Sequence, residues 1–207
     1  MNIQMLTVGP IMANCFIVGC DTTKEAAVID PGDETDKILF ALAKTGLNVK
    51  FIINTHGHFD HVGGNKKLKE ATRADLLIHP LDAPMLKSLS YSASRWGLDA
   101  DDSPPPDREI NDGEIIAFGT IHLEVIHTPG HTPGGVSLYS NGFVFVGDTL
   151  FSGSIGRTDF PGGDYGTLIS SIQKKLFRLP DHIQVMCGHG PATTIGQEKK
   201  YNPFARI

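Results

Sequence analysis

The feature that most constrains this chain is a dense group of metal-ligand side chains placed directly after an apolar run. Residues 51–53 are Phe-Ile-Ile, and His56, His58, Asp60 and His61 follow within a few positions. A continuous apolar run without alternation predicts a strand that is buried on both faces. Alternate side chains of an extended chain point to the same side, so we expect His56 and His58 to project toward one point. A turn after them lets Asp60 and His61 reach a neighbouring point.

This cluster predicts a metal centre rather than ordinary core or surface histidines. A single histidine near a strand end is usually a core or surface residue, and nine histidines in 207 residues is only a modest excess. Three imidazoles and a carboxylate within six positions are different. Without a metal, their proximity and burial would destabilise the charged forms. Neutral imidazole and carboxylate are the ligands that zinc and similar metals prefer.

Three further loops offer ligands from distant parts of the chain. His131, Asp148 and His189 each follow a predicted strand, and a glycine directly precedes each of them. Glycine allows the backbone to approach a bound group closely. A catalytic metal site needs ligands from several loops and an open coordination position, so we expect these three loops to converge on the cluster.

The remaining pattern predicts one α/β domain covering residues 1–207. Strands and helices occur in both halves, which suggests two packed sheets with helices outside. Asn141 and Gly142 predict a hairpin turn, and Gly46 is placed to cap a helix. The predicted strands are 3–8, 15–18, 26–29, 51–53, 76–78, 115–118, 123–126, 136–139, 143–146 and 183–186, and the predicted helices include 38–45, a single helix from about 61 that carries Leu68, and 168–179.

Residues 88–107 differ from the rest, because alternate serines and a run of three prolines predict an extended surface loop. A long loop in a compact domain is often a lid or a binding element. Trp96 in this loop is either a substrate contact or a local packing anchor.

Charge and cysteine usage exclude several classes of protein. The net charge is −5 and no long run of Lys or Arg is present, which argues against a nucleic-acid partner. No apolar run is long enough to span a membrane and the N-terminus does not resemble a signal peptide, so we expect a cytoplasmic protein without a membrane partner. Cys15, Cys20 and Cys187 form no CxxC pair and are expected in the core. Cys187 lies two residues before His189, so a ligand role is the alternative.

The ordered motifs HxHxDH, GH, GD and GHG resemble those of the metallo-β-lactamase superfamily. Residues 147–151 (GDTLF), 153–159 (GSIGRTD) and 188–194 (GHGPATT) are most similar to the glyoxalase II, or hydroxyacylglutathione hydrolase, group in its short single-domain form. The resemblance implies a four-layer αββα sandwich, with two mixed sheets and helices on both outer faces. It also implies a first metal on His56, His58 and His131, a second on Asp60, His61 and His189, and Asp148 as the bridge between them.

The same resemblance implies hydrolysis of a thioester such as S-D-lactoylglutathione by attack of a metal-bound hydroxide. Two divalent ions are expected, zinc first, with iron or manganese as alternatives. Asp60 and Asp148 would be the catalytic carboxylates. The partner would be a small-molecule acyl thioester, for example a glutathione conjugate, and the oligomeric state stays open.

Three residues near the motifs have less specific predictions. Asp30 either orients a ligand imidazole or closes a turn, and Thr149 would support the bridging aspartate. Arg157 either binds a substrate carboxylate in a forked geometry or pairs with Asp159 or Asp164. The long glyoxalase II type has lysine and tyrosine where this chain has Arg157 and Asp159, which weakens the case for tight glutathione selectivity.

Other functions remain alternatives. Persulfide dioxygenases resemble this chain in a GRTDF loop, here residues 156–160, and would use one iron on His56, His131 and Asp148. An esterase, phosphodiesterase or nuclease of the same superfamily is a second possibility, and the acidic charge argues against the nuclease. A non-catalytic metal module is disfavoured, since a closed structural site needs no bridging aspartate.

Overall fold

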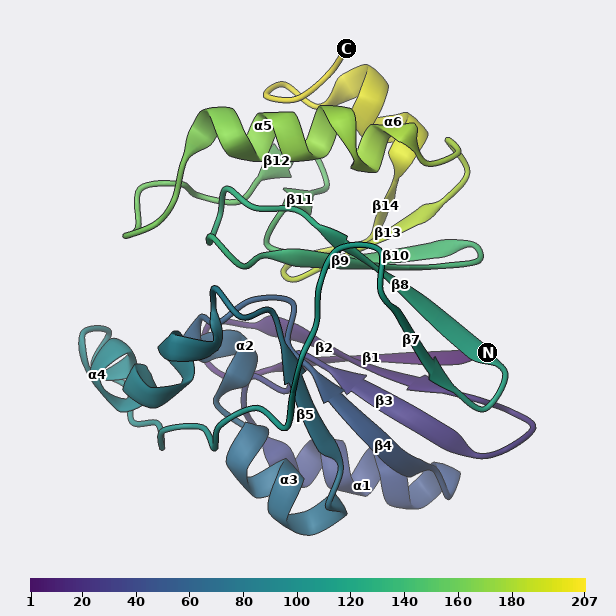
Figure 1. Ribbon diagram of the computed structural model, residues 1–207, viewed down its shortest axis with the longest axis vertical. Coiled ribbons are helices and arrows are strands. Elements are labelled where there is room, and N and C mark those ends of the chain that lie inside the picture. The colour runs from purple at the N-terminus through teal and green to yellow at the C-terminus, as the bar shows by residue number, and fades with distance from the viewer.

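Two six-stranded sheets pack face to face in the computed structural model, which describes residues 1–207 (Figure 1). The first sheet has the order β1-β2-β3-β4-β5-β6, formed by β1 (Asn2–Val8), β2 (Ala13–Gly19), β3 (Glu25–Ile29), β4 (Asn48–Ile53), β5 (Asp75–Ile78) and β6 (Arg108–Glu109). The second has the order β14-β13-β10-β9-β8-β7, formed by β7 (Ile115–Phe118), β8 (Ile121–His127), β9 (Val136–Ser140), β10 (Phe143–Gly147), β13 (Gln184–Cys187) and β14 (Thr193–Thr194). The short strands β11 (Leu150–Phe151) and β12 (Ser154–Ile155) form a separate pair.

Both sheets are mixed, and helices cover their outer faces. Strands β1 to β3 are antiparallel and β3 to β6 are parallel, whereas β10 and β13 are the parallel pair of the second sheet. In Figure 1, α1 and α3 lie below the first sheet, and α5 and α6 lie above the second. The helices are α1 (Thr35–Thr45), α2 (Phe59–Val62), α3 (Asn65–Thr72), α4 (Leu89–Ser94), α5 (Tyr165–Lys174) and α6 (Ile195–Tyr201), with 3-10 turns η1 (Ala83–Ser88) and η2 (Leu176–Arg178). The predicted four-layer sandwich is confirmed.

Three hydrophobic clusters fill the three spaces between the four layers. One lies between the first sheet and its helices, one between the sheets, and one between the second sheet and α5 and α6. In β2, Ile17 packs into the first cluster and Phe16 into the middle one, because successive side chains of a strand point to opposite faces. Phe16 meets Phe145 of the second sheet edge to face, with ring centroids 5.2 Å apart. The strands therefore have continuous apolar sequences because both of their faces are buried.

The helix predicted to start near His61 is two helices in the structure. Its path breaks at Gly63 and Gly64, which separate α2 from α3. A Cβ atom on Gly63 would lie 2.5 Å from the Gly32 carbonyl oxygen, and one on Gly64 would lie 2.5 Å from the Pro31 carbonyl oxygen. The two glycines thus let the chain pass close to the loop after β3, and that contact interrupts the helix.

The prediction of an extended loop over residues 88–107 is wrong for its first part. Residues 83–94 form η1 and α4, because Leu86, Leu89 and Ala93 recur at helical spacing and are all buried. The serines occupy the other face of these turns. From residue 95 to 107 the chain has no helix or strand, as predicted, and Trp96 follows α4 with 54% of its surface exposed.

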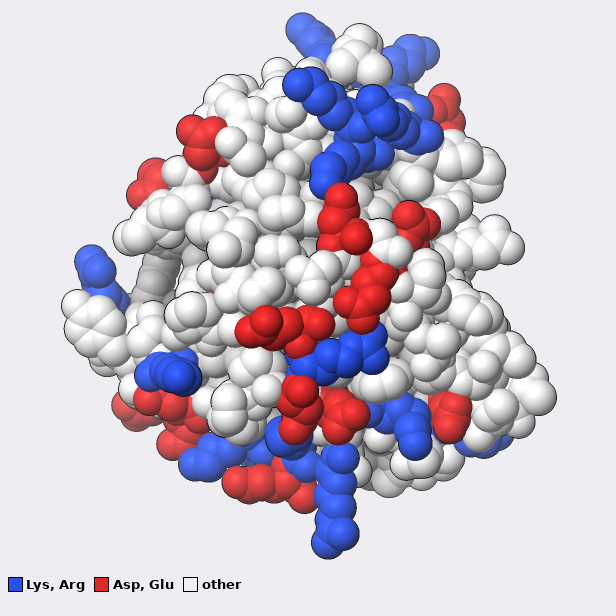
Figure 2. All heavy atoms as spheres, in the orientation of Figure 1, with Lys and Arg blue, Asp and Glu red and all other residues white.

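Charged side chains are unevenly spread over the surface. Figure 2 shows Lys and Arg gathered over the α5 and α6 layer, whereas both signs of charge are interspersed over the first sheet and its helices. No helix combines the length and apolar character required for a membrane span.

The inter-sheet contact should dominate stability. We expect Phe145→Ala to lower the free energy of unfolding by about 3–5 kcal/mol, because it leaves a cavity beside Phe16 in a fully buried site. Phe40 is 64% exposed, so Phe40→Ala is the matched control and should change stability by less than about 1 kcal/mol. Urea unfolding measures both. Equal effects of the two substitutions would contradict this description of the core.

Candidate metal centre

Two groups of ligand-type side chains lie side by side at one edge of the sandwich. In each group, the nitrogen and oxygen atoms that could bind a metal lie within 4.8 Å of one another. The two groups are His56, His58 and His131, and Asp60, His61 and His189. The structure therefore brings together the two sets of three side chains that the family resemblance implied, from segments that follow β4, β8 and β13.

Asp148 lies between these two groups. Its Oδ1 atom is 3.4 Å from His61 Nε2, and its Oδ2 atom is 3.6 Å from both His131 Nε2 and His189 Nε2. The residue follows Gly147, where β10 and β13 meet. A Cβ atom on Gly188 would lie 2.3 Å from Asp148 Oδ1, so the glycine before His189 is needed to admit this carboxylate. The carboxylate thus occupies the position that a bridging ligand requires.

The polar atoms of the centre fit divalent cations. His56 Nε2 and Asp148 Oδ1 are buried and have no hydrogen-bond partner. Buried polar atoms without partners are rare and destabilising. In addition, His58 Nδ1 lies 2.9 Å from His131 Nε2, and these two nitrogens can share at most one proton. A cation within each group would satisfy these atoms, and the donor set of imidazole and carboxylate suits zinc or iron.

Asp30 orients one imidazole of the second group. Its carboxylate accepts hydrogen bonds from the Thr55 backbone N–H at 2.7 Å and the Thr55 hydroxyl at 2.6 Å. Its Oδ2 also lies 3.1 Å from His61 Nδ1. An N–H at His61 Nδ1 donated to Asp30 leaves the Nε2 lone pair facing the centre. Of the two roles considered for Asp30, this contact supports the orienting one.

Other imidazoles are held in the same way. His131 Nδ1 lies 2.7 Å from the Arg157 carbonyl oxygen, and His189 Nδ1 lies 3.3 Å from the Met12 carbonyl oxygen. His56 Nδ1 lies 3.1 Å from the hydroxyl oxygen of Thr55. Each of these oxygens can accept a proton from Nδ1, which fixes the ring and turns Nε2 inward.

Burial keeps the first group neutral. The pKa of His56 is well below its usual value, because burial and then the neighbouring imidazoles disfavour the charged form. Burial, followed by the adjacent His131, lowers the pKa of His58 to about 3. Neutral imidazoles are the form that binds a metal.

The second group holds charge. Burial opposes protonation of His61, but the carboxylates of Asp148 and Asp60 raise its pKa to about 10. Burial would raise the pKa of Asp60, yet His61 and His189 hold it well below its usual range. In the absence of an ion, the imidazolium of His61 therefore neutralises part of the carboxylate charge that a metal would neutralise.

For Arg157, the structure shows one of the two predicted contacts, the pair with Asp159, whereas Thr149 does not make the predicted contact with Asp148. Arg157 Nε and Nη2 donate to the Asp159 carboxylate at 2.7 and 2.6 Å, which is the internal ion pair rather than a free fork. Asp164 is not its partner, since its carboxylate accepts from the Thr167 N–H at the start of α5. Thr149 Oγ1 lies 3.2 Å from a hydroxyl, that of Thr128, and no hydrogen bond joins its side chain to Asp148.

Asp82 is a buried carboxylate that sequence reasoning missed. One of its oxygens accepts from the Gly57 N–H at 3.0 Å and the other from the Gly134 N–H at 2.6 Å. It therefore ties the loop of His56 and His58 to the loop of His131. Asp82 lies in no motif, and its partners are 25 and 52 residues away in sequence, so no local signal marks it.

Asn14 is a second residue that the sequence did not indicate. Its side-chain amide donates to the carbonyl oxygens of Cys187 at 3.0 Å and Gly190 at 2.9 Å, on both sides of His189. Its own N–H donates to the Gly188 carbonyl oxygen at 2.7 Å. These contacts fix the loop of His189 against β2.

The remaining histidines and cysteines lie outside the two groups. His79 and His127 stack on each other with centroids 4.3 Å apart. Cys187 is buried in the third hydrophobic cluster, where burial raises the pKa of its thiol to about 12, so the predicted core role is favoured over a ligand role.

Comparisons of the sequence and of the fold with known proteins agree on one family. The model of the metallo-β-lactamase superfamily matches residues 8–189. A protein of Haemophilus influenzae named hydroxyacylglutathione hydrolase GloC is 44% identical, over 99% of this chain and 98% of its own length. Two solved structures are also similar. The B3 metallo-β-lactamase BLEG-1 has a TM-score of 0.92 and 36% identity, with 99% of each chain covered. TTHA1623 in a di-iron-bound form has a TM-score of 0.90 and 41% identity, with 97% of this chain and 99% of that chain covered.

Removal of the Asp82 link should weaken metal binding. In Asp82→Asn, the amide NH2 must face one of the two backbone N–H groups, so the loops lose one hydrogen bond and separate. We expect the affinity of the His56, His58 and His131 group for Zn²⁺ to fall about tenfold or more. Chelator competition measures it, with exposed Asp75→Asn as the matched control. An unchanged affinity in a folded variant would show that Asp82 does not position the loops.

The pKa values predict that the metal affinities of the two ligand groups depend differently on pH. His61 holds a proton below pH about 10, and an ion must displace it, so binding to the second group weakens as the pH falls from 8 to 6. His58 has a pKa of about 3, so it carries no competing proton in this range. We expect pH-dependent Zn²⁺ affinity in His58→Gln, which retains the second group, and nearly constant affinity in His61→Gln. The opposite pattern would reject this assignment of charge.

Proposed function

Since the chain belongs to the metallo-β-lactamase superfamily, we propose that it is a metal-dependent thioester hydrolase of the hydroxyacylglutathione hydrolase type. The observation that carries this proposal is the position of Asp148, with oxygens 3.4 to 3.6 Å from imidazoles of both ligand groups. The name of the relative at 44% identity over nearly the full length of both chains supports the thioester class.

The metal complement we propose is two divalent ions, zinc first, with iron as the alternative that the di-iron form of TTHA1623 suggests. His56, His58 and His131 would hold one, and Asp60, His61 and His189 the other, with Asp148 shared. When bound, such ions supply a water that ionises near neutral pH and positive charge for an acyl oxygen.

The chain's own groups would complete the reaction. Asp60 and Asp148 are 16% and 12% exposed, so their carboxylates reach the surface of the centre and can accept hydrogen bonds from the attacking water. Asp30, Thr55 and the carbonyl of Arg157 keep the imidazoles fixed while charge changes. A thiolate is a good leaving group, because thiols ionise near pH 8.5, so no general acid is required. The sequence has no GxSxG nucleophile motif.

The complete second group argues against a mono-iron dioxygenase. A single iron on His56, His131 and Asp148 would leave Asp60, His61 and His189 without a role, although these side chains converge within 4.8 Å. Hydrolysis of carboxylic esters or phosphodiesters uses the same centre, and only substrate comparison separates those reactions from thioester hydrolysis.

The test is one zinc-loaded sample assayed for S-D-lactoylglutathione hydrolysis and for oxygen uptake with glutathione persulfide. We expect hydrolysis, loss on chelation and recovery with Zn²⁺. Asp148→Asn should lower kcat/KM about 1000-fold and reduce metal content, since it weakens the binding of both ions. Asp75 is exposed, so Asp75→Asn should behave as wild type. Oxygen uptake with bound iron and without hydrolysis would overturn the proposal. Faster cleavage of simple esters or phosphodiesters than of the thioester would assign the hydrolase activity to those substrates instead.

A further inference from the structure

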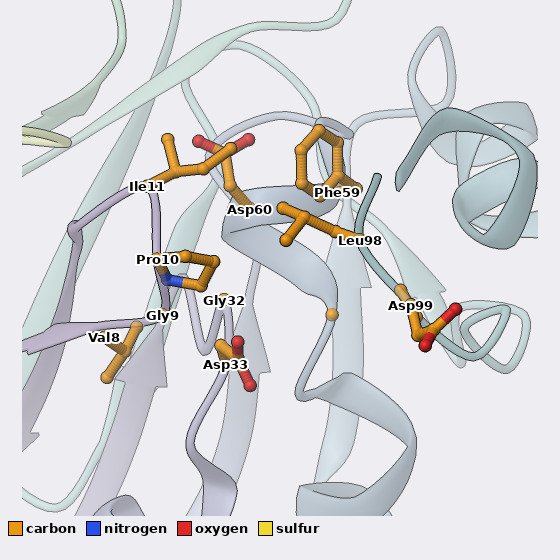
Figure 3. Close-up of a pocket in the computed structure, with 12 residues that line it drawn as sticks. Val8, Gly9, Pro10, Ile11, Gly32, Asp33, Phe59, Asp60, Leu98 and Asp99 are labelled. Atoms are coloured by element: carbon orange, nitrogen blue, oxygen red, sulfur yellow. The ribbon is translucent and has the colours of Figure 1, made fainter. Parts of the chain in front are cut away.

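A groove opens directly beside the centre. Figure 3 shows Asp60 at one end of it, with the turn between β1 and β2 on one side and Phe59 and Leu98 on the other. Pro10 and Ile11 contribute the apolar tip of that turn. The groove has a cavity volume of about 90 Å³, which is smaller than the roughly 300–1,000 Å³ of pockets that enclose small organic molecules, so it accommodates only part of a substrate. Because Asp60 lines the groove and also belongs to the second ligand group, the groove reaches the place where a substrate would react.

Three aromatic side chains continue the apolar lining from the groove to the ligand histidines. We call Phe59, Trp96 and Phe160 the aromatic wall. The ring centroids of Phe59 and Trp96 are 6.4 Å apart, those of Trp96 and Phe160 are 6.4 Å apart, and Phe160 meets His58 edge to face at 5.4 Å. The three residues come from α2, the segment after α4 and the loop after β12. Trp96 packs against both neighbouring rings but is still 54% exposed, so much of its surface can contact a substrate.

The charge around the groove does not suit an acidic thiol. No Lys or Arg lines the groove, and its acidic residues Asp33 and Asp99 would repel carboxylates. Arg157 lies over the Phe160 ring at 3.8 Å, and its Nε–Nη2 edge is bound to the Asp159 carboxylate, which offsets its charge. Glutathione carries two carboxylates, and they would find no free cation in this groove. The surface between α4 and α5 on the left of Figure 2 is mostly white, with a blue Lys or Arg side chain at its left edge and red Asp or Glu side chains above it.

We propose that the groove and the aromatic wall together bind an apolar acyl group of the thioester substrate that is longer than lactoyl. The reacting carbonyl would lie at the Asp60 end, and the acyl chain would extend between Ile11, Leu98 and Trp96. This inference rests on the proposed thioesterase function. A lactoyl group is short and carries a hydroxyl, so it would leave these apolar surfaces in water, whereas a longer chain would cover them.

A binding experiment tests the groove without catalysis. Trp96 is the only tryptophan of the chain, so its fluorescence reports directly on the wall. We expect octanoate, with its carboxylate at the zinc ions and its chain in the groove, to change the emission of the zinc-loaded protein saturably. Its Kd should be at least about tenfold below that of butyrate, because four more methylene groups leave water. Leu98→Ser should remove most of this difference. Tyr91→Ala, an exposed aromatic of α4 that is not part of the wall, should preserve it. Equal Kd values for butyrate and octanoate would overturn the proposal.

A kinetic series tests the same groove during turnover. Acetyl, lactoyl, butyryl and octanoyl thioesters of one uncharged thiol, N-acetylcysteamine, isolate the acyl group. We expect kcat/KM to rise at least about tenfold from acetyl to octanoyl. Trp96→Ala and Leu98→Ser should each bring the octanoyl-to-acetyl ratio close to one, and Tyr91→Ala should not change it.

The outcomes separate this inference from the proposed function. Hydrolysis of all the thioesters at similar rates would overturn the acyl groove and leave the thioesterase in place. Octanoate binding at Trp96 without hydrolysis of any thioester would overturn the thioesterase and support the groove as an apolar binding site.

Discussion

Five imidazoles and two carboxylates are crowded into one mostly buried site, and this constraint explains most of what surrounds them. Crowded, buried ionisable groups are unfavourable unless opposite charge compensates them. Part of that compensation is internal, since His61 takes a proton between Asp60 and Asp148. His56 Nε2 and Asp148 Oδ1 have no hydrogen-bond partner, so the side chains of the site do not satisfy all of its buried polar atoms. A pair of cations would complete the site, which is why its chemistry and its stability should depend on the same groups.

Such a site also needs a rigid support, and the structure provides it through buried polar contacts outside the ligand groups. Asp30 holds His61, Asp82 joins two ligand loops, and Asn14 holds the loop of His189. Each contact links segments that belong to different strands. The packed sheets bring the loops to one edge, but the final placement of the ligand atoms depends on these three side chains.

The same fold hosts many reactions, so the groups around the centre must decide which substrate reacts. On the side of Asp60, the groove combines apolar side chains with the carboxylates of Asp33 and Asp99 and has no Lys or Arg, and the nearby Arg157 pairs with Asp159. The centre would provide the hydrolytic chemistry, and the groove would select the acyl group. If this proposal holds, it explains why the groove of a chain similar to a hydroxyacylglutathione hydrolase has no Lys or Arg for the glutathione carboxylates.

The sequence by itself determined most of the strands and the cluster from His56 to His61, and the resemblance of its motifs to a known family implied the four-layer fold and the two groups of three side chains. The strands and the cluster are local features, because alternation in a strand and the spacing of His56 and His58 depend only on neighbouring residues. Tertiary structure decided the rest. The break between α2 and α3 follows from contact with residues 31 and 32, α4 follows from burial of an apolar face, and Asp82 and Asn14 act on partners up to 52 and 176 residues away. Contacts over such separations leave no pattern in a single sequence, because only the packing of the two sheets brings their partners together.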